Sequence, residues 1–156
     1  MKVTHVTQHE KQQTPQTYEQ LRLCNQLCFP LYAASKEVVK HYRPYLKKLD
    51  LTYTQYITMM VLWEKQEINI KELGDSLYLD SGTLTPLLKK LESKGYLKRS
   101  RLPEDERNVM VTLTQAGNDL RREARDIPGK MGTCVKLSQD EIQKLRNLLH
   151  KLLETL

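Results

Sequence analysis

Three cysteines are the residues of this chain best suited to covalent chemistry. A cysteine thiolate attacks peroxides and also binds zinc. Cys24, Cys28, Cys134 and His41 could together form a zinc site, but the chain has no CxxC pair, and His41 has no second histidine three or four residues away. We therefore expect no metal and no other cofactor. An odd number of cysteines without an export signal predicts thiols that are reduced at rest, so that any disulfide is transient and functional.

A run of basic residues is the second feature that could carry a function. The chain has 156 residues and a net charge of +6. Its isoelectric point near 9.2 favours a polyanionic partner. Between positions 89 and 107, four acidic residues stand against seven basic ones, which are Lys89, Lys90, Lys94, Lys98, Arg99, Arg101 and Arg107. Taken by itself, such a run has the alternative interpretation of a solvated charged face.

The residues around this run predict two short helices and a β-hairpin. The first helix has the apolar stripe Leu73, Leu77 and Tyr78, and Asp80 with Ser81 offers an N-cap for the second. The second helix has leucines at 84, 87, 88 and 91 and ends at the glycine at 95. β-rich runs at 96–101 and 109–113 flank a polar loop at 103–107, and residues 67–70 suit a third strand. The predicted fold is therefore a winged helix-turn-helix, mainly α with a small β wing.

This segment resembles the MarR family of dimeric transcription regulators. The resemblance lies in LDSGTLTPLLKKLESKGYLKRSR at 79–101 and DERNVMVTLTQAG at 105–117, and it extends from about position 21 to position 156. It implies a repressor that binds double-stranded operator DNA as a homodimer, and not an enzyme. The recognition helix, at about 81–94, is then expected to enter the major groove.

Two groups of residues are expected at the DNA. The recognition helix presents side chains to base edges near its N-terminal end and to phosphates further along, and the residues at these places are Ser81, Thr83, Thr85, Pro86, Lys89 and Lys90. The family resemblance implies that Arg107 of the wing enters the flanking minor groove. It also implies that Asp105 orients that arginine.

A further helix is expected directly before the winged motif. Thr52 or Thr54 can cap it, and it should run to about position 65. Its buried face is predicted to consist of Tyr56, Met59, Met60 and Trp63. This is ordinary core, and it completes a DNA-binding core at about 52–114.

The two ends of the chain predict a dimerisation region. Residues 1–17 are polar and aperiodic and are expected to form a flexible arm. A first helix at about 18–46 has an apolar stripe, with a kink expected at Pro30. The C-terminal helices at about 114–156 should break at 127–129 and restart at a capping box that begins with Ser138. A small winged domain cannot bury all these stripes, so we predict that the helices at 18–46 and 114–156 pair two chains.

The first helix narrows the family resemblance. The segment Asn25-Gln26-Leu27-Cys28-Phe29 resembles the OhrR-type organic hydroperoxide resistance repressors within MarR. This resemblance implies that Cys28 senses peroxides and that Tyr42 and Tyr53 hydrogen-bond the sensor. Cys134 stands where two-cysteine members of that group have a resolving thiol. Pro30 departs from the apolar residue more usual at its position.

The expected sensor chemistry requires residues from two subunits. Burial alone disfavours a charged thiolate, and hydrogen bonds from phenols oppose that effect. On a continuous helix, Tyr42 lies about 21 Å beyond Cys28, so a contact between them must cross between subunits. On such a helix the Cβ atom of Cys24 would lie about 5–6 Å from that of Cys28. Disulfides need about 3.5–4.5 Å, so we assign Cys24 no role.

The sequence thus predicts a cytoplasmic repressor that senses organic hydroperoxides. Its longest apolar run, at 57–63 apart from position 58, is too short to cross a membrane. After oxidation, Cys28 is expected to form a disulfide with Cys134. This bond should shift the recognition helices, so that the repressor leaves the operator. One alternative is a MarR-type regulator that responds to a small phenolic ligand. Another, a thiol peroxidase, would need a catalytic framework that the sequence does not show.

Overall fold

The N-terminal part of the chain is less helical than its apolar stripe predicts. The computed structural model describes residues 18–102 and 105–156, and the chain divides into two units, 1–37 and 38–156. The described residues of the first unit form the short 3₁₀ turns η1 (Glu19–Leu21) and η2 (Leu23–Asn25) and the start of α1 (Cys28–Leu46). The expected N-terminal arm lies outside the described residues.

The first helix therefore begins at Cys28, about ten residues later than expected. Pro30 is its third residue, where proline costs no helical hydrogen bond, because the first backbone N–H groups of a helix have no acceptor within it. The side chains of Asn25 and Gln26 donate to the backbone carbonyls of Glu19 and Gln20 in the preceding turns. Such side-chain bonds compete with the helix, which explains the late start.

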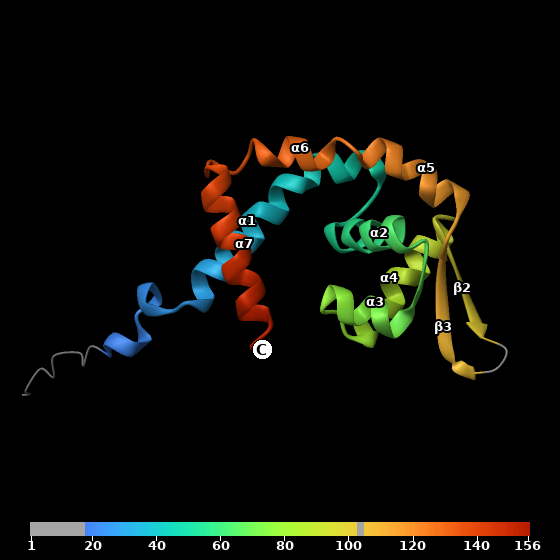
Figure 1. Ribbon diagram of the computed structural model, residues 1–156, viewed down its shortest axis with the longest axis horizontal. Coiled ribbons are helices and arrows are strands. Elements are labelled where there is room, and N and C mark those ends of the chain that lie inside the picture. Colours follow the sequence, from blue (N-terminus) through green and yellow to red (C-terminus); the bar gives the residue numbers. More distant parts are fainter. Residues whose placement is uncertain (1–17, 103–104) are drawn as a thin grey trace, which may run out of the picture. The chain divides into compact units, whose positions relative to one another are not determined.

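The predicted winged helix-turn-helix is confirmed. Its elements are α2 (Tyr53–Lys65), β1 (Glu67–Asn69), α3 (Ile70–Leu77), α4 (Ser81–Ser93), β2 (Leu97–Leu102) and β3 (Asp105–Leu113). Thr52 caps α2 in a reciprocal capping box with Gln55. In Figure 1 the long arrows of β2 and β3 form the hairpin beside α4.

The three strands form an antiparallel sheet in the order β1-β3-β2. The predicted third strand is confirmed, since Ile68 of β1 pairs with Val111 of β3. The hairpin strands are longer than expected, because Leu102 pairs with Asp105, and residues 105–107 belong to β3 and not to the loop. Backbone pairing in a two-stranded ribbon holds polar residues in a strand even where their own preference favours a turn.

The core lies under α4 and between α2 and the sheet. Its largest fully buried side chains are Met59, Leu62, Leu73, Leu84, Leu88, Leu91, Leu97, Val111 and Thr58. Met60 was wrongly assigned to it, since this side chain is 45% exposed and lines a surface groove beside the helix that follows β3. The prediction that Tyr78 belongs to the apolar stripe of α3 was also wrong. Tyr78 is 72% exposed and has a φ of 54°, because the left-handed residue that ends α3 turns away from the helical stripe.

The C-terminal helices are α5 (Gln115–Ala124), α6 (Ile127–Gly132) and α7 (Gln139–Leu153). The break falls at 125–126 and not at 127–129, because Pro128 lies in the first turn of α6, where proline is tolerated. The Ser138 capping box at the start of α7 is confirmed. Apolar side chains of α7 remain exposed in the single chain, namely Leu145, Leu148, Leu149 and Leu153. Within the described residues, no helix is long and apolar enough to cross a membrane.

Candidate functional site

The N-terminal end of α4 is held by Asp80. One carboxylate oxygen of Asp80 accepts from the backbone N–H of Thr83 at 2.9 Å, and the other accepts from the Thr83 hydroxyl at 2.9 Å. These hydrogen bonds from Thr83 lower the pKa of the Asp80 carboxyl below its ordinary value. Ser81 and Pro86 are exposed beside Thr83, whereas Thr85 is half-buried. Of the four residues predicted to read bases, Ser81, Thr83 and Pro86 are therefore exposed, but the Thr83 hydroxyl is engaged by Asp80.

Two neighbouring surfaces contain polar residues that the sequence analysis missed. A groove of about 240 Å³ brings Thr54 of α2 beside Thr83, Pro86 and Lys90 of α4. On the other side of α4, a cavity of about 470 Å³ is lined by Lys71 of α3 together with Ser81 and Thr85. Thr54 and Lys71 lie near the starts of α2 and α3, where the sequence suggests only a helix start. Only the packing of α2 and α3 against α4 places them at these surfaces.

The wing is bonded to the recognition helix through Arg99. Its guanidinium donates to one carboxylate oxygen of Glu92 at 2.6 and 3.0 Å, and its backbone N–H donates to the other at 2.9 Å. The bonds from Arg99 hold the pKa of the Glu92 carboxyl below its ordinary value. Arg99 therefore has a structural role. The side chains of Asp105 and Arg107 lie outside the described ones, although the backbone of both belongs to β3.

A second basic residue of the run is also engaged. The ammonium of Lys94 pairs with the carboxylate of Asp50 at 2.8 Å and also donates to its backbone carbonyl. In the described part of the chain, no carboxylate pairs with the exposed side chains of Lys89, Lys90, Lys98 and Arg101. These four cations are therefore the described members of the run that can meet a polyanion.

All three cysteines carry free, exposed thiols in the single chain. Cys28 is the first residue of α1, and Cys24 lies in η2. Cys134 follows α6, and its thiol donates to the backbone carbonyl of Lys130 at 3.7 Å. Within the described residues no group of three or more His, Cys, Asp and Glu side chains is placed to hold a metal ion.

The two tyrosines expected at the sensor lie together. The rings of Tyr42 and Tyr53 meet edge to face with centroids 5.0 Å apart, and Tyr56 adds a third ring 5.9 Å from Tyr42. Burial raises the pKa of the Tyr42 phenol above its ordinary value, and Tyr53 adds to the rise. Tyr42 is therefore protonated at neutral pH and can donate a hydrogen bond. Cys28 belongs to the first unit and the tyrosines to the second, so their pairing stays a prediction.

Comparison with known proteins places this chain among transcription regulators. The family model of the SarA/Rot transcriptional regulators matches residues 40–124. An organic hydroperoxide resistance transcriptional regulator of Bacillus subtilis is 47% identical over 139 residues, which cover 89% of this chain and 95% of that protein. The HTH-type transcriptional regulator SarZ of Staphylococcus haemolyticus is 52% identical over 127 residues, which cover 81% and 86%.

The solved structures similar to this chain include AbfR of Staphylococcus epidermidis. Reduced AbfR bound to DNA has a TM-score of 0.75 and 34% identity, with 88% of this chain and 94% of that chain covered. AbfR has also been solved in an overoxidised form bound to DNA and in a disulfide form. The chain is thus a transcription regulator and not an enzyme, and it belongs to the MarR family with the SarA/Rot regulators, as a DNA-binding repressor of the OhrR type.

Proposed function

We propose that this repressor binds its operator as a homodimer and that an organic hydroperoxide releases it by oxidising Cys28. The observation that carries the proposal is the edge-to-face pair of Tyr42 and Tyr53, at the positions where the sensor's phenols are expected. A half-buried phenol that stays protonated is the donor that a thiolate requires. We further expect the protein to act in the cytoplasm, where free thiols stay reduced.

The DNA contacts follow from the exposed face of α4. Ser81, Thr83 and Pro86 are exposed toward base edges, with Thr85 half-buried beside them. Lys89 and Lys90 are exposed for phosphates, and neither has an acidic partner among the described residues. We place Arg107 in the minor groove with Asp105 beside it, on the family resemblance alone. Two such surfaces in a dimer would read half-sites about one turn of DNA apart.

The sensing step is a two-electron oxidation of sulfur. The Cys28 thiolate attacks one oxygen of the hydroperoxide, the O–O bond breaks, and the sulfur becomes a sulfenic acid. The other oxygen leaves with the organic group and takes a proton to become an alcohol. The helix α1 is continuous from Cys28 to Leu46, as the argument for phenols from the partner subunit requires.

Release requires more than oxygen on the sulfur. For AbfR, the overoxidised protein was solved on DNA, and a disulfide form was solved separately. We infer that in this chain a disulfide is the releasing modification, because only a new covalent bond forces two chain segments to a separation of about 2 Å between sulfurs. Cys134 of the partner subunit is the candidate resolving thiol, with water as the leaving product, and thiol exchange reverses the bond.

The test measures DNA release together with the modified sulfur. A duplex that the protein binds is first selected from a random DNA pool. Fluorescence anisotropy then follows binding of this duplex while cumene hydroperoxide is added in an amount equal to that of the protein. The wild type should dissociate, and Cys28→Ser should stay bound. Ser35→Ala, at an exposed position of the same helix α1, is the matched control and should dissociate like the wild type. Dissociation of Cys28→Ser as readily as the wild type would refute the sensor assignment.

A second candidate function is a response to a small phenolic anion. It is favoured by a groove of about 420 Å³ between α2 and α5, where Trp63 and Met60 lie beside Arg121, Arg122 and Arg125. Aromatic and guanidinium groups together suit an aromatic carboxylate. Mass spectrometry after treatment with one equivalent of hydroperoxide distinguishes the two functions. A regulator that responds only to a ligand would show no selective modification of Cys28, and salicylate alone would then release it from DNA.

A further inference from the structure

The structure removes the geometric reason for leaving Cys24 without a role. On one α-helix, the i and i+4 side chains are held at a separation too long for a disulfide. Here α1 begins only at Cys28, and Cys24 lies in the preceding turn η2. Gln26 between them is extended, with φ −95° and ψ 120°. No α-helical hydrogen bond therefore fixes the separation of the two sulfurs.

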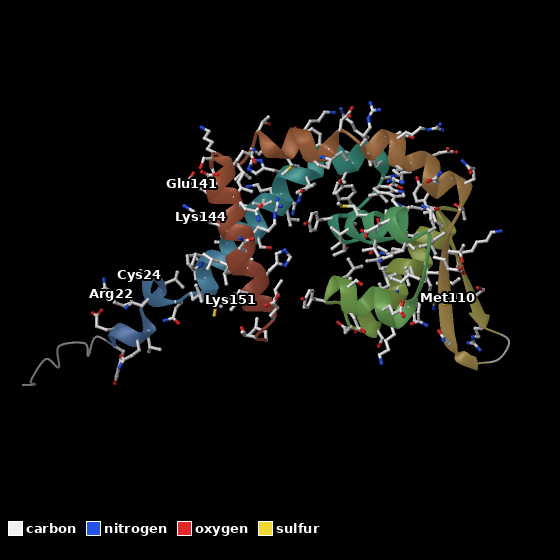
Figure 2. The ribbon with its side chains drawn as sticks, viewed as in Figure 1. Arg22, Cys24, Met110, Glu141, Lys144 and Lys151 are labelled. Carbon is white, nitrogen blue, oxygen red and sulfur yellow. The ribbon has the colours of Figure 1, made fainter. Side chains whose placement is uncertain are left out.

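Within the described residues, exposed local bonds hold the segment that joins the two cysteines. The N–H of Gln26 donates to the carbonyl of Leu23 at 3.1 Å, and the side chain of Asn25 donates to the carbonyl of Glu19 at 2.8 Å. The Cys24 thiol itself donates to the side-chain oxygen of Asn25 at 3.7 Å. Figure 2 shows Cys24 and Arg22 on this short segment before α1. Rotation within the turn can move Cys24 without unwinding α1.

We propose that Cys24 is a resolving thiol for Cys28 of the same chain, an inference that rests on the sensing function proposed above. After the hydroperoxide has converted Cys28 to a sulfenic acid, the Cys24 thiol attacks its sulfur. An S–S bond forms, the S–O bond breaks, and the oxygen leaves as water with the thiol's proton. The hydroperoxide is the only oxidant that the step needs, and both thiols are exposed in the single chain.

Proximity in sequence favours this route over the one through Cys134. Three residues separate Cys24 from Cys28, so the two thiols meet at the high effective concentration of a short linker. A bond from Cys28 to Cys134 of another subunit requires the movement of separate segments instead. The local bond captures the sulfenic acid before more peroxide converts it irreversibly to the sulfinic form. Cys24 thus determines how much Cys28 is overoxidised and how much becomes a covalent dimer.

Trypsin offers a direct test on the full-length protein. Cleavage after Arg22 and Lys36 leaves both cysteines in one peptide, 23–36, whereas Cys134 lies in the separate peptide 131–136. After one equivalent of cumene hydroperoxide and alkylation of the remaining thiols, peptide 23–36 should be two hydrogens lighter and unalkylated. The same peptide should appear in Cys134→Ser, which should run as a single chain on a non-reducing gel.

The Cys24→Ser variant completes the test. It should lose the lighter peptide entirely and show more covalent dimer through Cys134, more sulfinic acid on Cys28, or both. The proposal is overturned if Cys28 of the wild type becomes oxidised while Cys24 stays fully alkylated. That result would leave the sensing function intact. A wild type in which Cys28 itself remains alkylated, with no dimedone adduct, would instead overturn the sensing function and this inference with it.

Discussion

Substitution of Gly117 by alanine tests the packing that joins the wing to the helices. Gly117 lies in the first turn of α5, and its N–H donates to the hydroxyl of the capping residue Thr114 at 3.1 Å. Its carbonyl accepts from the buried indole N–H of Trp63 at 2.8 Å. A Cβ atom added at this glycine would lie 2.1 Å from the backbone carbonyl oxygen of Tyr96 and 2.7 Å from a methyl group of Leu113.

The size of the effect follows from which atom must move. A contact at 2.1 Å must open by about 1 Å, and the obstacle is a backbone carbonyl, which cannot swing away like a side chain. That carbonyl also accepts the N–H of Thr114 at 3.1 Å, so its displacement strains the helix cap. Overpacking costs about 1–3 kcal/mol, and we expect the upper end, about 3 kcal/mol. For a chain of this length, the melting temperature should fall by roughly 6–12 °C.

The assay is thermal unfolding at one fixed protein concentration, because a dimer's melting temperature depends on concentration. Gly129→Ala is the matched control, since this glycine is also helical but has no atom within 4 Å of an added Cβ. It should be neutral or stabilising by up to about 1 kcal/mol. Operator affinity should fall with Gly117→Ala, because Tyr96 directly precedes β2. Equal melting temperatures for the two variants would refute the reasoning.

Three further predictions concern the DNA surface and the sensor. Lys90→Gln should weaken operator and non-specific DNA alike and reduce the slope of log K against log salt by about one, whereas Lys94→Gln, whose ammonium is already paired with Asp50, should leave the slope unchanged. Arg99 lowers the pKa of the Glu92 carboxyl in the folded protein. The pair therefore stabilises the fold at pH values above the carboxyl's pKa in the unfolded chain, which is near 4.5, and this effect is lost as the pH falls through the lower pKa of the folded state. Melting temperatures of wild type and Glu92→Gln should therefore differ at neutral pH and converge in acid. Tyr42→Phe should slow oxidation of Cys28 about tenfold in stopped-flow measurements by removing a hydrogen bond to a charged group, whereas Tyr45→Phe should not.

The winged core could be predicted because its signals are local. The sequence predicts four helix caps or helix starts, and the side chain of each accepts a backbone N–H in the structure. These residues are Thr52, Asp80, Thr114 and Ser138. The start of α1 could not be predicted from its apolar stripe. Periodicity continues through residues that form 3₁₀ turns, and the outcome depends on side-chain bonds from Asn25 and Gln26 to carbonyls six residues earlier.

The candidate site was only partly accessible from sequence. The run of basic residues is visible, but the engagement of Lys94 by Asp50 joins positions 44 residues apart, which no local pattern shows. The encounter of Tyr42 and Tyr53 was implied by family resemblance and not by spacing. Thr54 and Lys71 were missed because their neighbours on α4 come from other parts of the chain.

The bonds inside the winged domain constrain how any switch can work. Three hydrogen bonds from Arg99 tie β2 to Glu92 of α4, and the indole of Trp63 ties α2 to α5. A signal that changed the angle between recognition helix and wing would have to break these bonds, three of which reach a carboxylate and are costly to lose. Movement of two intact winged domains relative to each other breaks none of them. We therefore infer that release, when it occurs, alters the spacing of two rigid DNA-reading surfaces and leaves each surface unchanged.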